Sequence, residues 1–362
     1  MADLAANFGI IPNVGGRDIA DILAPQGARR QDIGDFGDEY QDIVDYILRC
    51  THRIWEQKDV GLIATHYAPD IRVHMMTGPV DGMDGVIAGT ARILSAFPDR
   101  TLTGEAVIWS DEGDQTYLSS HRITSTATNL GTSELGPATG RRITFTTIAD
   151  CLCKANLIIE EWLVRDYSGM ALALGYAPRV VAITHAAGDK AKGAGKAVWR
   201  QEAMAVIRDG ALGGFPEAHL PDPVADPTAF AHAVFETILN HRRFGHLRDV
   251  YCPSAHWAGP GNRRLFGHGE ITGWYIALIG SFGDARLRVD HVASVTSERG
   301  TMIAVRWSMA GTHDGNALYG APSGEPVYVL AVTHWLIRHG RIIDEVTIFD
   351  EVALLRQIEG GL

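Results

Sequence analysis

The chain has 362 residues, of which 46% are hydrophobic and 21% are charged, and its formal net charge is −11 at pH 7. At roughly 100–200 residues per domain, this length predicts two domains. The acidic balance argues against an extended basic surface for phosphates, so we expect no nucleic-acid partner.

Several common sequence signals are absent. No apolar run is long enough to span a bilayer, and the N-terminus has no basic region followed by an apolar core. The four cysteines, Cys50, Cys151, Cys153 and Cys252, make no disulfide framework. We therefore expect a cytoplasmic protein with reduced thiols and no membrane partner. There is no Gly-x-Gly-x-x-Gly, Walker-type loop or His-Glu-x-x-His, so we expect no cofactor.

The predicted elements place helices first and strands second. Residues 1–40 lack a sustained period and form an N-terminal extension that either packs on a domain or dangles. A helix then begins with Asp42 as its N-cap. It is followed by a short helix (Val60–Tyr67), a strand (Ile71–Met75), a helix (Val86–Ala96), and the strands Leu102–Trp109, Gln115–Thr126, Arg142–Lys154 and Leu157–Asp166. Helices segregated from an antiparallel meander predict the α+β class.

One segment occurs twice in the chain. Leu157–Asp166 is repeated as Arg341–Asp350, so the closing aspartates lie 350 − 166 = 184 positions apart. The same offset aligns an ordered series of turn, boundary and core residues. The series includes Asp42 with Asp226, Ile54 with Ile238, Gly61 with Gly245, Tyr67 with Tyr251, Arg122 with Arg306, Gly140 with Gly324 and Glu161 with Glu345. We conclude that the chain is a tandem duplication of one domain.

The duplication sets the predicted boundaries. We expect a first domain at 41–176, a linker at 177–224 and a second domain at 225–362. Within the linker, Ala187–Lys196 has the composition of a flexible basic connector, and Ala197–Arg208 is expected to be helical. Both faces of Val327–Ile337 are apolar, so this strand is expected to be covered on both sides.

The order of elements resembles the nuclear-transport-factor-2-like superfamily, and its motifs are most similar to the SnoaL-like polyketide cyclase branch. In the second half, the family's usual order is followed by Gly311–Gly315, Gly320–Val327, Gly340–Ile342, Asp350 and Leu354–Ile358. The first half keeps Glu160-x-Trp162 and Asp166, but has Asn129 where the second has His313. The resemblance covers roughly residues 42–175 and 226–358.

This resemblance implies a cone: a curved antiparallel sheet wrapped around helices, with a pocket at its open end. Family members commonly dimerise through the outer sheet face. The two copies are therefore expected to pair within the chain as a pseudo-dimer, and a homodimer is a further option. Such folds host many chemistries, so the resemblance leaves the reaction open.

Asp350 and Asp166 match the acid/base aspartate of the family's cyclases. Read as strands, the two repeats place apolar side chains on the face that ends at each aspartate. These are Ile158, Trp162 and Val164 before Asp166, and Ile342, Val346 and Ile348 before Asp350. A carboxyl group beside apolar walls has its pKa raised toward neutral pH. The alternative is a strand-end aspartate that is bonded to backbone or paired with arginine.

Other residues are candidates of lower rank. His334 is expected on the strand beside Asp350, although a His on an apolar strand face is more often a core residue. Arg306 and Arg122 either pair with a carboxylate or clamp an anionic oxygen of the substrate. The candidates for substrate binding are His256, His74, Trp274, Tyr319, Trp162 and His313, the last in a loop that is expected to be exposed or at the pocket mouth. His256, His313 and His334 could converge, but their spacing is not that of metal ligands, so no metal is expected.

The favoured function is a cofactor-independent enzyme on a small or medium carbonyl compound. An inward aspartate would move a proton next to the carbonyl, as in SnoaL-like cyclases or lyases, isomerases, dehydratases and hydrolases of related folds. A non-catalytic module that binds a small molecule or associates with a partner is the alternative. A third option is one active copy and one scaffold. The second copy is then favoured, because His334 and His313 replace Asp150 and Asn129.

Overall fold

The computed structural model describes residues 29–193, 197–209 and 219–361. They form two compact units. Unit 1 contains the described residues up to Met75, Pro79–Arg165 and Ala293–Arg299, and unit 2 contains Met76–Gly78, Asp166–Val292 and the residues from Gly300 onward. No described helix combines the length and the apolar character that a bilayer crossing demands.

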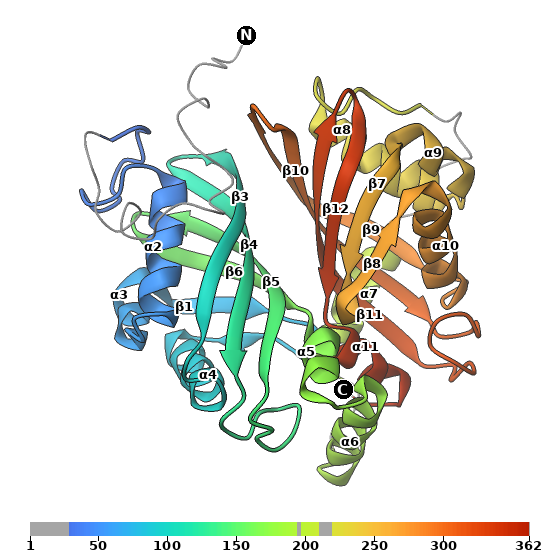
Figure 1. The fold of residues 1–362 in the computed structure, drawn as a ribbon, viewed down its shortest axis with the longest axis horizontal. Coiled ribbons are helices and arrows are strands. Elements are labelled where there is room, and N and C mark those ends of the chain that lie inside the picture. The colour runs from blue at the N-terminus through green and yellow to red at the C-terminus, as the bar shows by residue number, and fades with distance from the viewer. Residues whose placement is uncertain (1–28, 194–196, 210–218, 362) are drawn as a thin grey trace. The chain divides into compact units, whose positions relative to one another are not determined.

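Unit 1 is built on a six-stranded mixed sheet with the order β2-β1-β6-β5-β4-β3 (Figure 1). Its helices are α2 (Ile43–Trp55), η2 (Val60–Leu62), α3 (Ile63–His66) and α4 (Met83–Ala96). Its strands are β1 (Tyr67–His74), β2 (Val80–Asp81), β3 (Thr101–Gly113), β4 (Thr116–Thr128), β5 (Arg142–Lys154) and β6 (Leu157–Arg165). The meander β3 to β6 is antiparallel as predicted, whereas β1 joins β6 in parallel.

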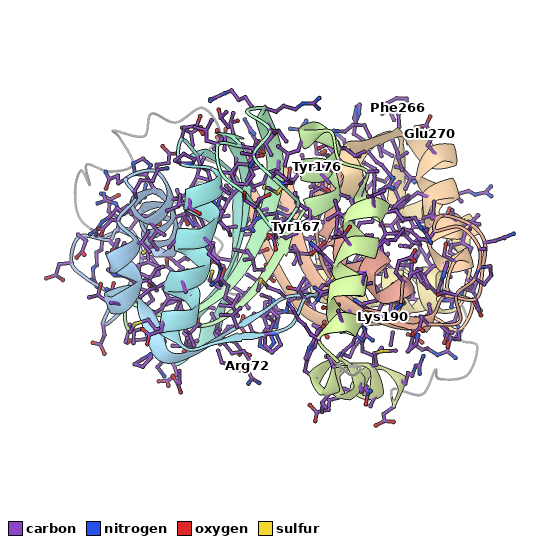
Figure 2. All side chains as sticks on the ribbon, turned by 90° about the horizontal axis from the view of Figure 1, so that it is seen from below. Arg72, Tyr167, Tyr176, Lys190, Phe266 and Glu270 are labelled. Carbon is purple, nitrogen blue, oxygen red and sulfur yellow. The ribbon has the colours of Figure 1, made fainter. Side chains whose placement is uncertain are left out.

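A second sheet repeats this plan with the order β8-β7-β12-β11-β10-β9. The helical segments of the second half are α8 (Pro227–Ala233), the π-helical η3 (Val234–Asn240), η4 (Phe244–His246), α9 (Leu247–Val250), η5 (Pro260–Asn262), α10 (Gly267–Gly280) and α11 (Glu351–Ile358). Its strands are β7 (Tyr251–Gly259), β8 (Arg263–Phe266), β9 (Arg286–Ser297), β10 (Gly300–Thr312), β11 (Pro326–Arg338) and β12 (Arg341–Phe349). In unit 2, the carboxylate of Glu270 closes the start of α10 by accepting a hydrogen bond from the N–H of Phe266 at 2.8 Å (Figure 2).

Strand register confirms the duplication. In unit 1, Ser120 pairs with Asp150, which pairs with Trp162. In the second sheet, Ala304 pairs with His334, which pairs with Val346. Each of these residues lies 184 positions after its counterpart, so the offset found in the sequence describes equivalent positions in two equal sheets.

The sheet face predicted for the first residue of the apolar series in the last strand of each copy is wrong. These residues are Ile158 in β6 and Ile342 in β12. In β12 the register shifts between Asp344 and Ile342, and in β6 it shifts between Glu160 and Ile158. A β-bulge adds one residue and reverses the alternation of side chains beyond it. Ile158 therefore joins the core beneath α2, together with Ile47 and Cys50, instead of sharing a face with Trp162.

The N-cap prediction for the first helix is confirmed. The side chain of Asp42 accepts a hydrogen bond from the N–H of Asp45 at 2.7 Å. The described end of the N-terminal extension packs here, because Ile33, Phe36 and Tyr40 are buried in the core that includes α2. The rest of the extension lies outside the described residues.

The flexible connector predicted at 187–196 is wrong over its first part. Helix α6 (Pro178–Ala191) runs into it, and α7 (Val198–Arg208) confirms the helix expected after it. Contacts with the C-terminal segment hold α6, among them the ion pair of Arg179 with Glu359 at 2.7 Å. Lys190, labelled in Figure 2, donates through Nζ to the carbonyl of Glu359 at 2.8 Å. Arg356 binds the carboxylate of Asp189 at 2.5 and 2.7 Å. Residues 194–196 lie outside the described part.

Each sheet has an inner face and an outer face. The inner face carries α2 and α4 in unit 1, and α8, η3 and α10 in unit 2 (Figure 1). Contacts identify its residues: Thr51 of α2 reaches His121 of β4, and Phe230 of α8 reaches the ring of Trp335 on β11. Because side chains alternate along a strand, the registers then assign every other strand residue to a face.

Candidate functional site

The two candidate aspartates lie at helix N-termini. Asp350 caps α11, and its carboxylate accepts a hydrogen bond from the N–H of Ala353 at 2.9 Å. Asp166 caps α5 (Tyr167–Leu174), accepting from the N–H of Gly169 at 2.8 Å and from the hydroxyl of Ser168 at 3.0 Å. These are the backbone bonds of the structural alternative that the sequence left open.

Asp166 also holds a turn of unit 2. Its carboxylate accepts hydrogen bonds from the N–H groups of Gly261 and Asn262, at 2.7 and 3.1 Å. Four donors thus converge on a side chain whose residue is 2% exposed. A carboxylate with its acceptor positions occupied in this way has a clear structural task.

We predict that Asp166→Ala lowers the free energy of unfolding by about 2–3 kcal/mol, because it removes a cap and leaves backbone N–H groups unpaired. Asp226→Ala is the matched control. Among the described contacts, the side chain of Asp226 makes one hydrogen bond, from the N–H of Ala229 at the start of α8. Losing this cap should lower the free energy of unfolding by about 1 kcal/mol. Urea unfolding of both variants tests the difference. Equal losses would show that the bonds to Gly261 and Asn262 contribute nothing.

The remaining strand candidates lie on the outer faces. Trp335 is on the inner face, so its neighbour His334 is on the outer one, and the register places Arg306 there too. Arg306 lies close enough to Asp290 to oppose the rise that burial causes in the pKa of that carboxyl group. Arg122, the repeat counterpart of Arg306, has the equivalent position in unit 1.

The outer-face histidines already have partners. In unit 1, His74 stacks on Trp162 with ring centroids 5.1 Å apart, and its Nε2 lies 2.8 Å from the carboxylate of Glu160. His256 packs edge-on against Phe266 at 5.1 Å. These contacts account for the three candidates His74, His256 and Trp162 in structural terms.

The loop histidine is buried, so the expectation that His313 is exposed is wrong. Its Nδ1 lies 3.1 Å from the hydroxyl of Ser323. The same nitrogen accepts a hydrogen bond from the backbone N–H of Ser323 at 3.2 Å. Its ring packs on Phe282 at 5.8 Å. Burial lowers the pKa of His313, and the nearby Arg179 lowers it further.

Trp274 and Tyr319 come together at an ion pair. Arg263 binds the carboxylate of Glu351 at 2.8 Å and lies 5.2 Å from the ring centre of Trp274. The hydroxyl of Tyr319 donates to the same carboxylate at 3.3 Å. Both aromatic residues are buried, so they act here as packing around a charged pair.

A buried glutamate that was not among the candidates organises the inner face of unit 2. Glu345 is 0% exposed, and its carboxylate accepts five side-chain hydrogen bonds. The donors are the hydroxyl of Tyr251, Trp257 Nε1 at 2.8 Å, the hydroxyl of Tyr275 at 2.6 Å, Trp335 Nε1 at 3.1 Å and the hydroxyl of Thr347 at 2.5 Å. A carboxylate offers about four lone-pair positions, so this one is saturated.

The equivalent Glu161 of unit 1 has a different environment. Tyr67, the counterpart of Tyr251, keeps its hydrogen bond to the carboxylate. The other four donors, at the 184-residue offset, are replaced by Val73, Ala91, Cys151 and Leu163. Three of these have no polar hydrogen on the side chain and the fourth has only a thiol. Unit 1 therefore contains the glutamate and the tyrosine of this network, but none of the other four hydroxyl or indole donors.

The electrostatics of Glu161 follow from this environment. Burial raises the pKa of its carboxyl group to about 7, against the opposing effects of Tyr67 and Arg165. Burial also raises the pKa of Tyr67 well above its ordinary value, and the charge of Glu161 adds to this. At neutral pH the site therefore holds a neutral phenol beside a carboxyl group that is close to half-ionised.

Comparison with a family model decides the classification. A model described as SnoaL-like polyketide cyclase matches residues 46–174 and 230–358, together more than half of the chain. The chain belongs to the SnoaL-like polyketide cyclase family. Both copies are matched, as the duplication predicts.

Several solved structures are similar to one copy of this family domain. TsrD from Streptomyces laurentii is 24% identical, over 36% of this chain and 94% of that chain, with a TM-score of 0.32. IdmH from Streptomyces antibioticus is 22% identical, over 36% and 96%, with a TM-score of 0.31. An NTF2-like protein of unknown function from Burkholderia pseudomallei is 19% identical, over 33% and 88%, with a TM-score of 0.28. A search of curated proteins finds no match.

The SnoaL-like copies also differ in a buried histidine of the inner face. In unit 1, His121 is 2% exposed and its Nδ1 lies 3.5 Å from the hydroxyl of Thr51. Its counterpart in unit 2 is Val305. Burial lowers the pKa of His121 to about 3, so the imidazole is neutral at pH 7. Among the described residues, no group of three or more His, Cys, Asp or Glu side chains is placed to hold a metal ion.

One signal could have pointed to these inner-face residues. Glu161 and Glu345 recur at the same place in the middle of a strand, where a glutamate is rarely buried without a partner. The pair Glu161 and Glu345 is part of the series that aligns the two halves of the chain, and it also marks a buried acid in each half. His121 has no counterpart, so the repeat could not reveal it.

Proposed function

We propose that the chain is a cofactor-independent acid/base enzyme acting on a small or medium carbonyl compound, with its active site on the inner face of unit 1. The observation that carries this proposal is the buried carboxyl group of Glu161, whose pKa is raised to about 7. Of the five residues that correspond to the donors around Glu345, only Tyr67 still has a hydroxyl group to donate to it. A general acid/base works best when its pKa lies near the working pH.

In the proposed reaction, the ionised carboxylate of Glu161 removes a proton from the carbon next to the carbonyl. The electron pair of that C–H bond becomes the C=C bond of an enolate, and the carbonyl oxygen takes the negative charge. Glu161, now protonated, returns the proton to carbon or to oxygen. Return to another carbon gives isomerisation, attack of the enolate on a second carbonyl gives ring closure, and loss of a β-hydroxyl as water gives dehydration.

This proposal assigns the acid/base role to Glu161 and not to the residues that the sequence favoured. Asp350 and Asp166 match the family's acid/base position, but their described bonds cap helices and, for Asp166, also hold the turn at Gly261 and Asn262. His334 and Arg306 lie on the sheet face opposite to Glu345. In the second copy, Glu345 is saturated by five donors, which favours a structural role there. One working copy and one scaffold copy is therefore the favoured arrangement, with the first copy working.

Deuterium exchange tests the proposal without knowledge of the natural substrate. The probe is 2-tetralone in D2O, whose protons next to the carbonyl are followed by NMR. The protein is expected to accelerate exchange, and Glu161→Gln should reduce the catalysed rate by at least about 100-fold, the usual contribution of a general base. Glu160→Gln is the matched control, since Glu160 is the preceding residue on the outer face. Exchange that survives in Glu161→Gln would refute the role of Glu161.

A further inference from the structure

Helix α6 of unit 2 is apolar on two opposite sides. Its inner side is packed against the protein, because Val181, Ala182 and Ala186 are buried. Its outer side repeats apolar or small residues at the spacing of one helix face. These residues, called the α6 stripe below, are Val180, Ile183, Thr184, Ala187 and Ala191, and all of them are exposed. None of them is charged, so this surface helix presents an apolar face to solvent.

The α6 stripe differs from an ordinary solvent face. Val180 and Ile183 are 62% and 47% exposed, and Leu172 of the preceding helix α5 is 50% exposed. The other linker helix, α7, has polar and charged residues on its exposed side. These are Gln201, Glu202 and Arg208. A contiguous apolar face on a surface helix typically marks a place where another surface binds.

The family fold does not account for the stripe. The SnoaL-like match ends at residue 174 and resumes at residue 230, so α6 lies between the two matched segments. The helix also has no counterpart in the repeat, because it belongs to the segment that connects the two copies. The stripe is therefore a feature of the connector.

The two halves of the stripe have complementary shapes. The N-terminal half has the larger side chains, Val180 and Ile183, and the C-terminal half has Ala187 and Ala191. Beside them lies Gly188, where an added Cβ would meet nothing within 4 Å. When two such helices run antiparallel, the large residues of one face the small residues of the other. A two-fold interface requires a surface that fits itself in this way.

Charges at the border of the stripe are balanced within the chain. Arg179 binds the carboxylate of Glu359 at 2.7 Å, and Lys190 donates to the carbonyl of the same residue. Figure 2 labels Tyr176 and Lys190 near the two ends of α6. Two copies of a chain with a net charge of −11 repel each other, so a contact between copies is favoured where apolar residues lie among neutralised charges.

We propose that the α6 stripe binds the α6 stripe of a second copy of this chain, as an antiparallel helix pair about a two-fold axis. Val180 then faces the partner's Ala187, and Ile183 faces the partner's Thr184. A helix of 14 residues is about 21 Å long. Two faces of that length bury on the order of 1,000 Å² in total, the lower limit for a specific interface, so the dimer is weak. This interface does not involve Glu161 and is independent of the proposed function.

Sedimentation velocity of the full chain tests the dimer. The wild-type protein is expected to change from monomer to dimer between about 1 µM and about 200 µM, as suits a small interface. Ile183→Glu should weaken the dimer at least about 10-fold, because it brings two carboxylates together beside the axis. Val180→Glu is a second variant, in case Ile183→Glu does not fold. Val206→Glu is the matched control, since Val206 is 54% exposed on α7, outside the stripe.

Disulfide cross-linking tests the antiparallel arrangement. Residue 184 lies beside the two-fold axis, so Thr184→Cys should cross-link two copies readily under mild oxidation. Val180→Cys should cross-link much more slowly, because the two copies of residue 180 are about 10 Å apart along the helix axis. The wild-type protein measures the background from Cys252, the partly exposed cysteine among those that the structure describes.

Four results would overturn the inference. The wild-type protein is monomeric up to about 200 µM, where a small interface should already associate. The dimer persists in both glutamate variants of the stripe. Val206→Glu weakens the dimer as much as Ile183→Glu does. A monomeric wild-type protein that sediments with vesicles of phosphatidylcholine and phosphatidylglycerol would assign the stripe to a lipid surface instead. Faster cross-linking of Val180→Cys than of Thr184→Cys would overturn the antiparallel pairing.

Discussion

Replacing Glu345 by Gln is expected to lower the free energy of unfolding of unit 2 by about 3–5 kcal/mol, because five buried donors lose acceptor positions and their shared hydrogen-bond network is broken. Five donors point at this carboxylate, including Trp257 Nε1 and the hydroxyl of Tyr275. A glutamine side chain has nearly the same shape as glutamate, but its amide nitrogen carries two N–H donors. These would face the hydroxyl and indole donors that now bind the carboxylate. Glu161→Gln is the matched control, and it should cost less than about 1 kcal/mol at pH 5, where Glu161 is already neutral.

Hydrogen–deuterium exchange followed by mass spectrometry resolves the two copies. Peptides from β12 should exchange much faster in Glu345→Gln than in the wild-type protein, while peptides from β6 keep their protection. Local resolution matters because a chain with two compact units need not unfold in one step. Equal and small effects of the two substitutions would show that the five hydrogen bonds of Glu345 add no net stability.

The stability of unit 1 is expected to fall as pH rises from about 4.5 to about 7, because of Glu161. Burial raises the pKa of its carboxyl group to about 7, from 4.5 in the unfolded chain. Between these values the folded chain binds a proton that the unfolded chain has lost, so raising the pH favours unfolding. The shift corresponds to a loss on the order of 3 kcal/mol by pH 8, all of it absent below about pH 4.5.

Glu161→Gln isolates this contribution, since glutamine does not titrate. The difference in urea midpoint between the variant and the wild-type protein should be near zero at pH 5 and should favour the variant at pH 8. Other titrating groups contribute equally to both proteins and cancel. A difference that does not change between pH 5 and pH 8 would mean that Glu161 is ionised with an ordinary pKa, and the proposed base would lose its basis.

The fold could be predicted from sequence because its signals are local and repeated. The turn glycines, the N-cap Asp42 and the alternation of the meander strands each restrict the backbone, and a second copy doubles every signal. The linker prediction failed where Ala, Asp and Lys were interpreted by composition. Asp189 is bound by Arg356, which lies 167 residues away, and no local pattern contains that contact.

The candidate site was less predictable because alternation shows which residues share a face but not which face meets the helices. In β11 both faces are apolar, so His334 and Trp335 were equally eligible for the interior. The bulges in β6 and β12 add a second uncertainty, because one extra residue reverses the assignment of Ile158 and Ile342. The contrast between Glu161 and Glu345 depends on donors from several elements, which come together only in the folded chain.

The parallel pairing of the first and last strands has a consequence for synthesis on the ribosome. β1 cannot gain its neighbour β6 until residue 165 has emerged, so the sheet of the first copy is completed by its own last strand. Such long-range pairing slows folding, and exposed strand edges invite wrong pairing in the meantime. β12 is built on the same register and could compete for β1. The interval in which the ribosome translates residues 166–340 gives β6 the first opportunity, which protects the chain from exchanging strands between its copies.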